Sequence, residues 1–235
     1  MNMSKPLFFW GNDAPDDPRM LVSAILFGWV VNTIVLLWFS QEIIHAQPAI
    51  DSGLSLYGMR GILLVTMGWC GCFFSAMGAQ IRIKQQYKDD EAATFLAERA
   101  MMNSLEHAIP SLVVIWLSGI YCNSMLATVL GGIYVVGRLL YPIFYGWYGH
   151  FTMLVEFATH LGYFAVGALY FSLMGKLIGN ESWLVAHLQD WYIPFVLLGG
   201  WFVFMGLQMT MIGWGVYAPI YERGLRWKKE FDEKL

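Results

Sequence analysis

Long apolar stretches without charged residues dominate the chain. They cover residues 20–41, 61–81, 108–137, 157–175 and 191–221. Each stretch reaches or exceeds the roughly 18 to 20 residues that a helix needs to cross the hydrocarbon core of a bilayer. The strands of a membrane β-barrel instead alternate in polarity over about ten residues, which excludes that architecture. The pattern predicts an all-α integral membrane protein.

Turn residues divide these stretches into six predicted transmembrane helices. The apolar run 108–137 is interrupted by a short polar turn at Tyr121, Asn123 and Ser124, so it belongs to two helices. The third helix is polar in its first half and becomes apolar only later. The predicted helices cover residues 20–41, 60–83, 92 to about 120, 124–147, 151–175 and 193–217. The polar segment 176–190 is predicted to lie at the membrane interface.

The distribution of basic residues predicts the orientation in the membrane. With six spans, ten Lys and Arg residues fall on one side, in the amino-terminal segment, in the loop near residues 82–88 and in the tail after residue 222. The other side has only Arg60 and Lys176. Because cytoplasmic loops carry the excess of Lys and Arg, we expect both termini in the cytoplasm.

Composition narrows the class of partner. Only 13% of the residues are charged, against about a quarter in soluble domains, so membrane lipids are the expected surroundings. A net charge of -3 without a basic stripe argues against nucleic acid as a partner. The first apolar run follows Asp13, Asp16 and Asp17 rather than a basic region, unlike a cleavable signal. The short loops and the lack of a targeting signal favour a bacterial inner membrane over the endoplasmic reticulum.

Two neighbouring helices each carry polar residues along one face. On the third helix the polar face contains residues four, three and four positions apart, namely Arg99, Asn103, Glu106 and Pro110. On the fourth helix the corresponding residues are Tyr134, Arg138, Tyr141, Tyr145 and Tyr148. An ionised side chain in hydrocarbon costs on the order of 3 kcal/mol, so we expect both faces to turn toward a common crevice. Such a crevice suits a small polar ligand that carries carboxylates and an amine.

Two other interpretations of the buried polar residues stay open at this point. Glu106 and Arg138 could neutralise each other as an ion pair, with the tyrosines acting as interface residues. Glu156 and His160, one turn apart on the fifth helix, could instead be metal ligands together with Glu106 and His107. A hydrogen-bonded pair inside the helix bundle explains Glu156 and His160 equally well.

The two polar faces resemble a known family. The order Glu98, Arg99, Asn103, Glu106, followed by Tyr134, Arg138, Tyr141 and Tyr145, is similar to that of the MAPEG family, the membrane-associated proteins in eicosanoid and glutathione metabolism. The resemblance covers about residues 60–175 and implies a four-helix core. Residues 1–59 then add an amino-terminal segment and one helix, and residues 176–235 add an interfacial segment, another helix and a basic tail.

The resemblance also implies a ligand and an assembly. It implies a homotrimer that binds glutathione as a cosubstrate between neighbouring subunits, near the cytoplasmic side. It assigns glutathione contacts to Arg99, Asn103, Glu106, Tyr141 and Tyr145, with Arg138 as a structural or ligand-pairing arginine. Arg82 matches a further carboxylate-binding position more loosely. The expected activity is conjugation or thiol-dependent reduction of a lipophilic electrophile from the bilayer.

One departure from the family pattern affects catalysis. In catalytic members an arginine about two turns beyond the last tyrosine stabilises the glutathione thiolate, as a nearby cation should. Here residues 146–154 contain no arginine, and only Tyr148 or His150 could take its place. The alternative function is therefore a noncatalytic accessory subunit of a larger membrane complex, with residues 20–41 and 193–217 contacting the partners.

Overall fold

The computed structural model of the protein describes residues 18–179, 182–205, 219–220 and 222–223. Within these residues the regular structure is helical, and five helices are long and apolar enough to cross a membrane. These five helices are α1 (Pro18–Trp38), α3 (Leu56–Gln86), α4 (Glu91–Tyr121), α5 (Ser124–Tyr148) and α6 (Met153–Gly179). The prediction of an all-α membrane protein is confirmed.

Local capping explains where the long helices begin. Helix α3 begins at Leu56 rather than at residue 60, because Ser55 accepts a hydrogen bond from the Gly58 amide. Asp90 caps α4 by accepting from the amides of Ala92 and Ala93. Helix α6 begins at Met153 and continues to Gly179, four residues beyond the predicted end. The segment expected at the interface therefore starts as a continuation of α6.

Four shorter elements complete the described structure. Three of them lie in the connections, namely α2 (Ser40–His45), the 3-10 helix η1 (Ala49–Ser52) and α7 (Trp183–Ala186). The fourth, α8 (Ile193–Met205), is apolar and covers the first part of the predicted sixth span. The rest of that span, residues 206–217, lies outside the described residues.

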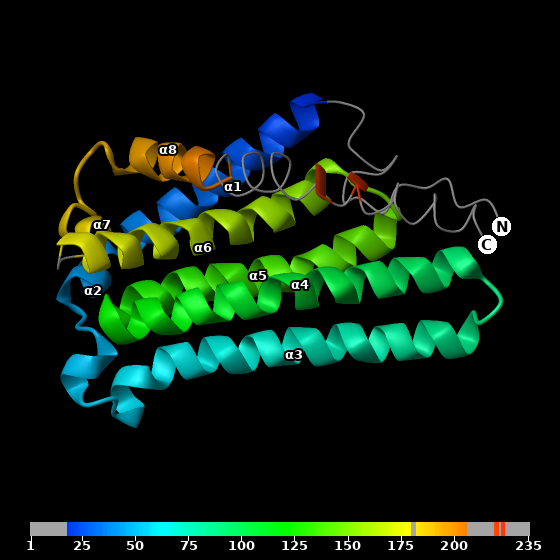
Figure 1. Cartoon of the computed structure of the whole chain (residues 1–235), viewed down its shortest axis with the longest axis horizontal. Helices are drawn as coiled ribbons and strands as arrows, with labels where there is room; N and C mark the ends of the chain where they lie inside the picture. The colour runs from blue at the N-terminus through cyan, green and yellow to red at the C-terminus, as the bar shows by residue number, and fades with distance from the viewer. Residues whose placement is uncertain (1–17, 180–181, 206–218, 221, 224–235) are drawn as a thin grey trace.

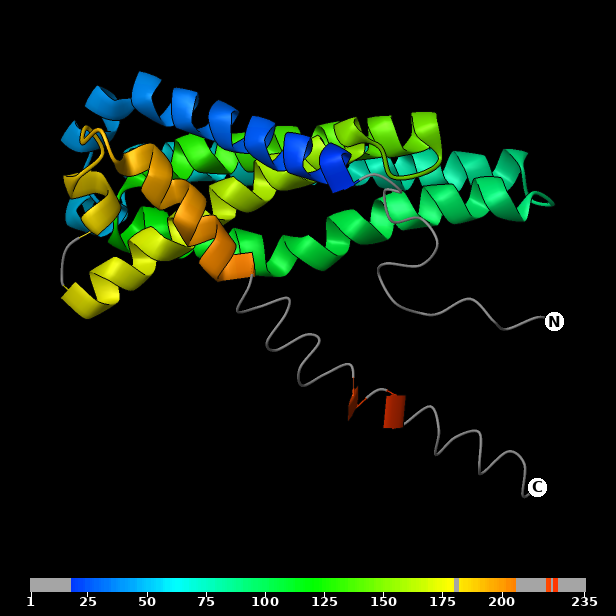
Figure 2. The ribbon, with the colours of Figure 1, turned by 90° about the horizontal axis from the view of Figure 1, so that it is seen from above.

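The long helices pack side by side in an up-and-down order (Figure 1). Helix α3 lies at one side of the molecule against α4 and α5, and α6 packs on α4 and α5. Helices α1 and α8 lie at the opposite side and pack on α6, as Figure 2 also shows. Elements α2, η1 and α7 gather at one end, while the α3–α4 and α5–α6 connections lie at the other (Figure 1).

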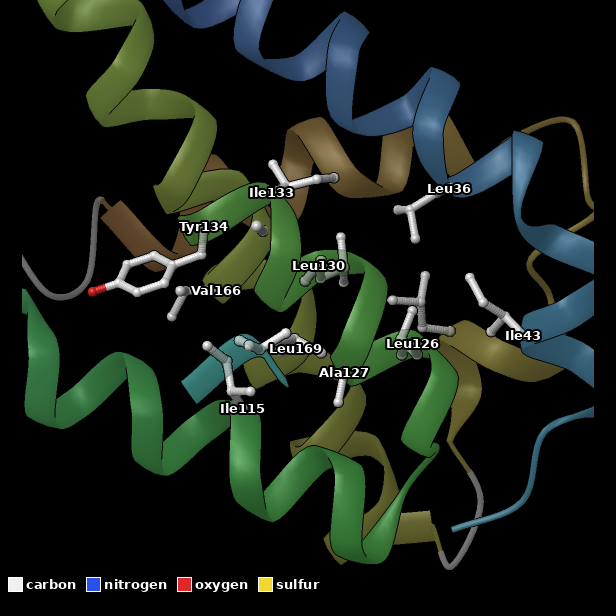
Figure 3. Close-up of a cluster of buried hydrophobic side chains, with 14 of the residues drawn as sticks. Leu36, Ile43, Ile115, Leu126, Ala127, Leu130, Ile133, Tyr134, Val166 and Leu169 are labelled. Atoms are coloured by element: carbon white, nitrogen blue, oxygen red, sulfur yellow. The ribbon is translucent and has the colours of Figure 1, made fainter. Parts of the chain in front are cut away.

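The largest apolar core lies where α5 meets α6, α4 and the α1–α2 corner. Leu126, Leu130 and Leu169 are almost completely buried there, and Figure 3 shows them between the helices. Leu36 and Ile43 close the core from the α1 and α2 side. Asn123 holds this corner, because its amide donates to the carbonyls of Ile43 and Ala46.

Helices α5 and α6 approach closely at Gly137. A Cβ atom added at this position would lie 2.7 Å from the Ala158 carbonyl oxygen of α6. Small residues permit such close approach between membrane helices. The close contact also brings Arg138, the next residue along α5, against Gly162 of α6. A Cβ atom added at Gly162 would lie 3.6 Å from Arg138 Nη2.

Candidate functional site

The centre of the candidate site is a hydrogen bond between α5 and α4. Arg138 Nη1 donates to Asn103 Oδ1 over 2.7 Å, and the two side chains are almost fully buried. The Nε and Nη2 atoms of Arg138 are also buried and have no hydrogen-bond partner in the described part of the chain. Among the described residues, no carboxylate lies within 4 Å of the guanidinium. The predicted meeting of the two polar faces is confirmed at these two residues, and the proposed Glu106–Arg138 ion pair is not formed.

The aromatic ring of Tyr134 lies against the guanidinium of Arg138. The guanidinium carbon lies 5.3 Å from the centre of the Tyr134 ring, a distance at which a cation is attracted to an aromatic face. The Tyr134 hydroxyl donates to the backbone carbonyl of His107 over 3.1 Å. Tyr134 therefore links α5 to α4 next to the Arg138–Asn103 hydrogen bond.

Tyr141 and Tyr145 extend the site toward the end of α5. Their rings stack with centres 5.5 Å apart and both side chains are buried. They pack against Ala100 of α4 and against Val155 and Ala158 of α6. The Tyr141 hydroxyl is buried and has no hydrogen-bond partner in the described structure, so its capacity to donate and accept is unused there.

Two prolines interrupt the helical hydrogen bonding of α4 and α5 near the site. Pro110 and Pro142 lie inside α4 and α5. A proline has no amide hydrogen, so the carbonyl four residues earlier loses its helical donor. These carbonyls belong to Glu106 and Arg138, both residues of the predicted polar faces.

Arg99 and Glu106 lie at the rim of the site rather than inside it. Arg99 is half-buried, and its charge acts on Glu106 on the same helix. Glu106 is exposed, on a surface that it shares with Met102 and Ile109. In the single chain Glu106 therefore does not join Asn103 in the buried cluster, and its contact with a ligand stays a prediction. Neighbouring residues of this face differ by up to about 60° in direction around the helix axis. A small rotation of α4 therefore buries one edge of the face and exposes the other.

The other residues expected at the site lie outside this buried cluster. Tyr148 and His150 are exposed at the end of α5, where the His150 ring donates to the Tyr148 carbonyl over 2.8 Å. Arg82 is exposed near the end of α3. Whether any of them contacts a ligand stays a prediction.

The suggested four-ligand metal site is not formed. Glu156 and His160 are close, with 3.5 Å between His160 Nε2 and Glu156 Oε2. In the described residues, however, no three His, Cys, Asp or Glu side chains are grouped as metal ligands would be. His107 lies instead against Tyr163 of α6, whose hydroxyl is 3.2 Å from His107 Nε2.

Sequence reasoning missed Tyr163. Glu156, His160 and Tyr163 are four and three positions apart, which is the same spacing as Tyr134, Arg138 and Tyr141 on α5. A search for a third polar face at that spacing would have found it.

Comparison with known proteins identifies the family. A model of the MAPEG family matches residues 54–175, which is more than half of the 235-residue chain. The matched region contains the site residues of α4, α5 and α6 and leaves α1 and α8 outside. Neither curated proteins nor solved structures give a match. This chain belongs to the MAPEG family.

Proposed function

We propose that the protein binds glutathione in the crevice between α4 and α5 and uses it on lipophilic electrophiles from the bilayer. Membership of a family that is generally associated with glutathione supports this ligand. The tripeptide carries two carboxylates and an amine, the groups for which the crevice has partners. The reaction is conjugation to the electrophile or its thiol-dependent reduction.

The buried guanidinium of Arg138 is the observation that carries the proposal. Its partner Asn103 is a neutral acceptor, and Nε and Nη2 have no partner among the described residues. A buried charge without a counter-charge is costly, so a ligand carboxylate next to Arg138 is stabilised strongly. The buried Tyr141 hydroxyl supplies a further donor beside it.

The second wall of the crevice comes from a neighbouring subunit in this proposal. Arg99 and Glu106 lie at the rim, and Glu106 faces outward from a membrane-spanning helix. A charged side chain directed at lipid is unfavourable, so a homotrimer in which this surface meets another subunit removes the cost. Helices α1 and α8 pack mainly on α6 rather than on α4, which carries Glu106.

The proposal includes the orientation and the number of spans. The crevice residues lie in the half of α4 and α5 that is next to the α3–α4 loop, where Lys84 and Lys88 are found. By the excess of basic residues this end is cytoplasmic, and a sixth span that continues α8 brings the carboxyl terminus to the same side. Glutathione then enters from the cytoplasm and the electrophile enters from the bilayer. A bacterial inner membrane is the proposed location.

A noncatalytic subunit of a larger membrane complex is the second candidate function. It is favoured by the lack of an arginine in residues 146–154, where catalytic relatives have the thiolate-stabilising cation. Tyr148 and His150, the weak candidates for this role, are exposed and outside the buried cluster. Such a subunit would contact its partners through residues 20–41 and 193–217.

Native mass spectrometry of the gently extracted protein, with and without glutathione, separates the two candidates. The proposed function predicts a mass three times that of one chain, which increases by one to three glutathione molecules. Arg99→Ala and Glu106→Ala should each weaken the binding, because each removes a charged partner at the rim. A heteromeric mass that glutathione does not change would instead support the accessory subunit.

A further inference from the structure

An apolar cavity lies between α6, α7 and α8. Its volume is about 560 Å³, within the range of roughly 300 to 1,000 Å³ that is usual for small-molecule sites. The lining residues of α6 run from Phe164 to Ile178, and those of α8 run from Val196 to Trp201. Helices α7 and α8 lie outside the family match, and none of the lining residues belongs to the proposed glutathione crevice. The cavity is therefore a separate feature of the added part of the chain.

Glycines and aromatic rings shape the cavity. Gly167 and Gly175 line it from α6, where a larger side chain would take up part of the space. A Cβ atom built at Gly200 of α8 would lie 2.9 Å from the Phe171 ring, so this glycine lets the ring lie against α8. At the end farther from α7, the rings of Phe164 and Trp201 stack with centres 5.0 Å apart. The walls are thus almost wholly apolar.

The cavity follows α6 through about one leaflet of the bilayer. Phe164 and Ile178 are separated by about 21 Å along the helix, at 1.5 Å per residue. The hydrocarbon core of a leaflet is about 15 Å thick, half of the roughly 30 Å of the bilayer. Ile178 is 81% exposed, so the cavity reaches the surface of the bundle near α7, at the end of α6 (Figure 1). It is long enough to hold a lipid chain from the interface to the middle of the bilayer.

Polar side chains lie at the α7 end of the cavity. Trp183 lines the cavity, and its ring centre is 4.8 Å from that of His187. His187 Nδ1 donates to Asp190 Oδ2 over 2.7 Å, because a carboxylate only accepts. The Tyr192 hydroxyl donates to the same oxygen over 2.7 Å. Asp190 thereby orients the imidazole, and in the neutral ring His187 Nε2 is left to accept a hydrogen bond.

The lining selects the chemistry of the ligand. Hydrocarbon and aromatic walls stabilise an aliphatic chain by dispersion and by removing it from water. A charged tripeptide such as glutathione would lose its hydrogen bonds with water there without replacement. A small polar headgroup at the α7 end would instead stay at the interface, where Trp183 and His187 lie. The cavity and the polar cluster beside it therefore fit the two parts of an amphipathic lipid.

We infer that this cavity binds one acyl chain of a membrane lipid, whose headgroup hydroxyl donates a hydrogen bond to His187 Nε2. The lipid enters from the leaflet next to α7, and its chain lies between α6 and the added helix α8. The site does not require glutathione, so it is independent of the proposed function.

A photoreactive monoacylglycerol tests the acyl-chain site in the full chain reconstituted in lipid vesicles. Its palmitoyl chain carries a diazirine near the methyl end. Light should attach the probe saturably to residues 164–175 and 196–201, and unlabelled monoacylglycerol should compete. Labelling spread evenly over the bilayer-facing helices, with no competition, would overturn the inference.

Variants that fill the cavity test the same site. Gly175→Leu and Gly167→Leu should each lower the labelling about tenfold, because the added side chain takes the place of the acyl chain. Gly71→Leu is the matched control, since Gly71 is exposed on α3 and its added Cβ meets no atom within 4 Å. Size-exclusion chromatography identifies the variants that fold. Labelling of a folded cavity variant at the wild-type level would overturn the inference.

Competition by lipids with and without a headgroup tests the contact with His187. His187→Leu should weaken monoacylglycerol binding about fivefold, as expected for one lost hydrogen bond. Competition by hexadecane, which has no headgroup, should not change. His45→Leu, at an exposed histidine of α2 at the same end of the bundle, is the control. Equal monoacylglycerol affinities of the wild type and His187→Leu would overturn the headgroup contact.

Discussion

Arg138 of α5 and Asn103 of α4 are joined by a buried hydrogen bond of 2.7 Å. The acceptor is an amide oxygen, which orients the guanidinium without neutralising its charge. The same bond joins the polar face of α5 to the polar face of α4. The geometry thus leaves the positive charge without a counter-charge among the described residues.

Asn103→Leu should destabilise the protein, because it leaves a buried guanidinium nitrogen without its acceptor. The expected loss is about 1 to 3 kcal/mol in the free energy of unfolding. Thermal denaturation of the purified protein in detergent measures it, with Gln85→Leu, at an exposed position of α3, as the control. Equal melting temperatures for Asn103→Leu and the wild type would mean that the hydrogen bond contributes little.

Gly137→Ala should separate α5 from α6, because the added methyl group would lie 2.7 Å from the Ala158 carbonyl oxygen. Overpacking of this kind costs about 1 to 3 kcal/mol. Gly132→Ala is the matched control on the same helix, since its added Cβ meets no atom within 4 Å. The melting temperature should fall for Gly137→Ala and stay within a few degrees for Gly132→Ala. The reverse order would contradict the packing described for these helices.

Asn123→Ala should loosen the corner between α2 and α5. The side chain caps α5 by accepting from the Leu126 amide over 2.8 Å and donates to the carbonyls of Ile43 and Ala46. Loss of the cap alone costs about 1 kcal/mol. Ser55→Ala, which removes the exposed cap of α3, should have a smaller effect. Hydrogen exchange of the α2 amides should accelerate in Asn123→Ala only, and unchanged exchange there would refute the assigned role.

The stability contributed by Asp190, in the connection between α7 and α8, should decrease in acid. Hydrogen bonds from Tyr192 and from His187 hold the pKa of Asp190 below its ordinary value of 3.8. A carboxyl group with a lowered folded-state pKa stabilises the fold above its ordinary pKa. This contribution is lost as the pH falls through the lowered value. Tyr192→Phe removes the stronger hydrogen bond, so the pKa of Asp190 should rise toward 3.8.

Carbon-13 NMR of aspartate-labelled protein in micelles measures this shift. The Asp190 resonance should titrate at higher pH in Tyr192→Phe than in the wild type, while Tyr57→Phe, at an exposed tyrosine on α3, should leave it in place. The same titration midpoint in all three proteins would show that the Tyr192 hydroxyl does not act on Asp190.

Periodicity predicted much of the fold and part of the site. The long apolar runs, with the run 108–137 divided at its polar turn, predicted the five spans that are described. Length and polarity alone decide whether a helix can cross a bilayer. The steps of four and three predicted that Asn103 and Arg138 meet, since such steps keep residues on one helical face. The exposure of Glu106 depends on the rotation of α4, which is decided by packing against α5 and α6.

The contacts of α6 were harder to predict. Glu156 and His160 were recognised as neighbours on one helix, but their cover by Gly28 and Trp201 involves residues far apart in sequence. No periodic pattern within one helix encodes which other helix packs on it. The same reason explains why the contact between His107 and Tyr163 was not anticipated.

Calorimetric titration of glutathione into the wild type, Arg138→Gln and Arg60→Gln tests the central claim most directly. Arg60 is an exposed arginine at the other end of the bundle and serves as the matched control. Loss of a buried charged partner should weaken binding by about 2 kcal/mol or more, roughly thirtyfold, in Arg138→Gln, with no change in Arg60→Gln. Equal affinities of the wild type and a folded Arg138→Gln variant would contradict the assignment of the crevice as the glutathione site.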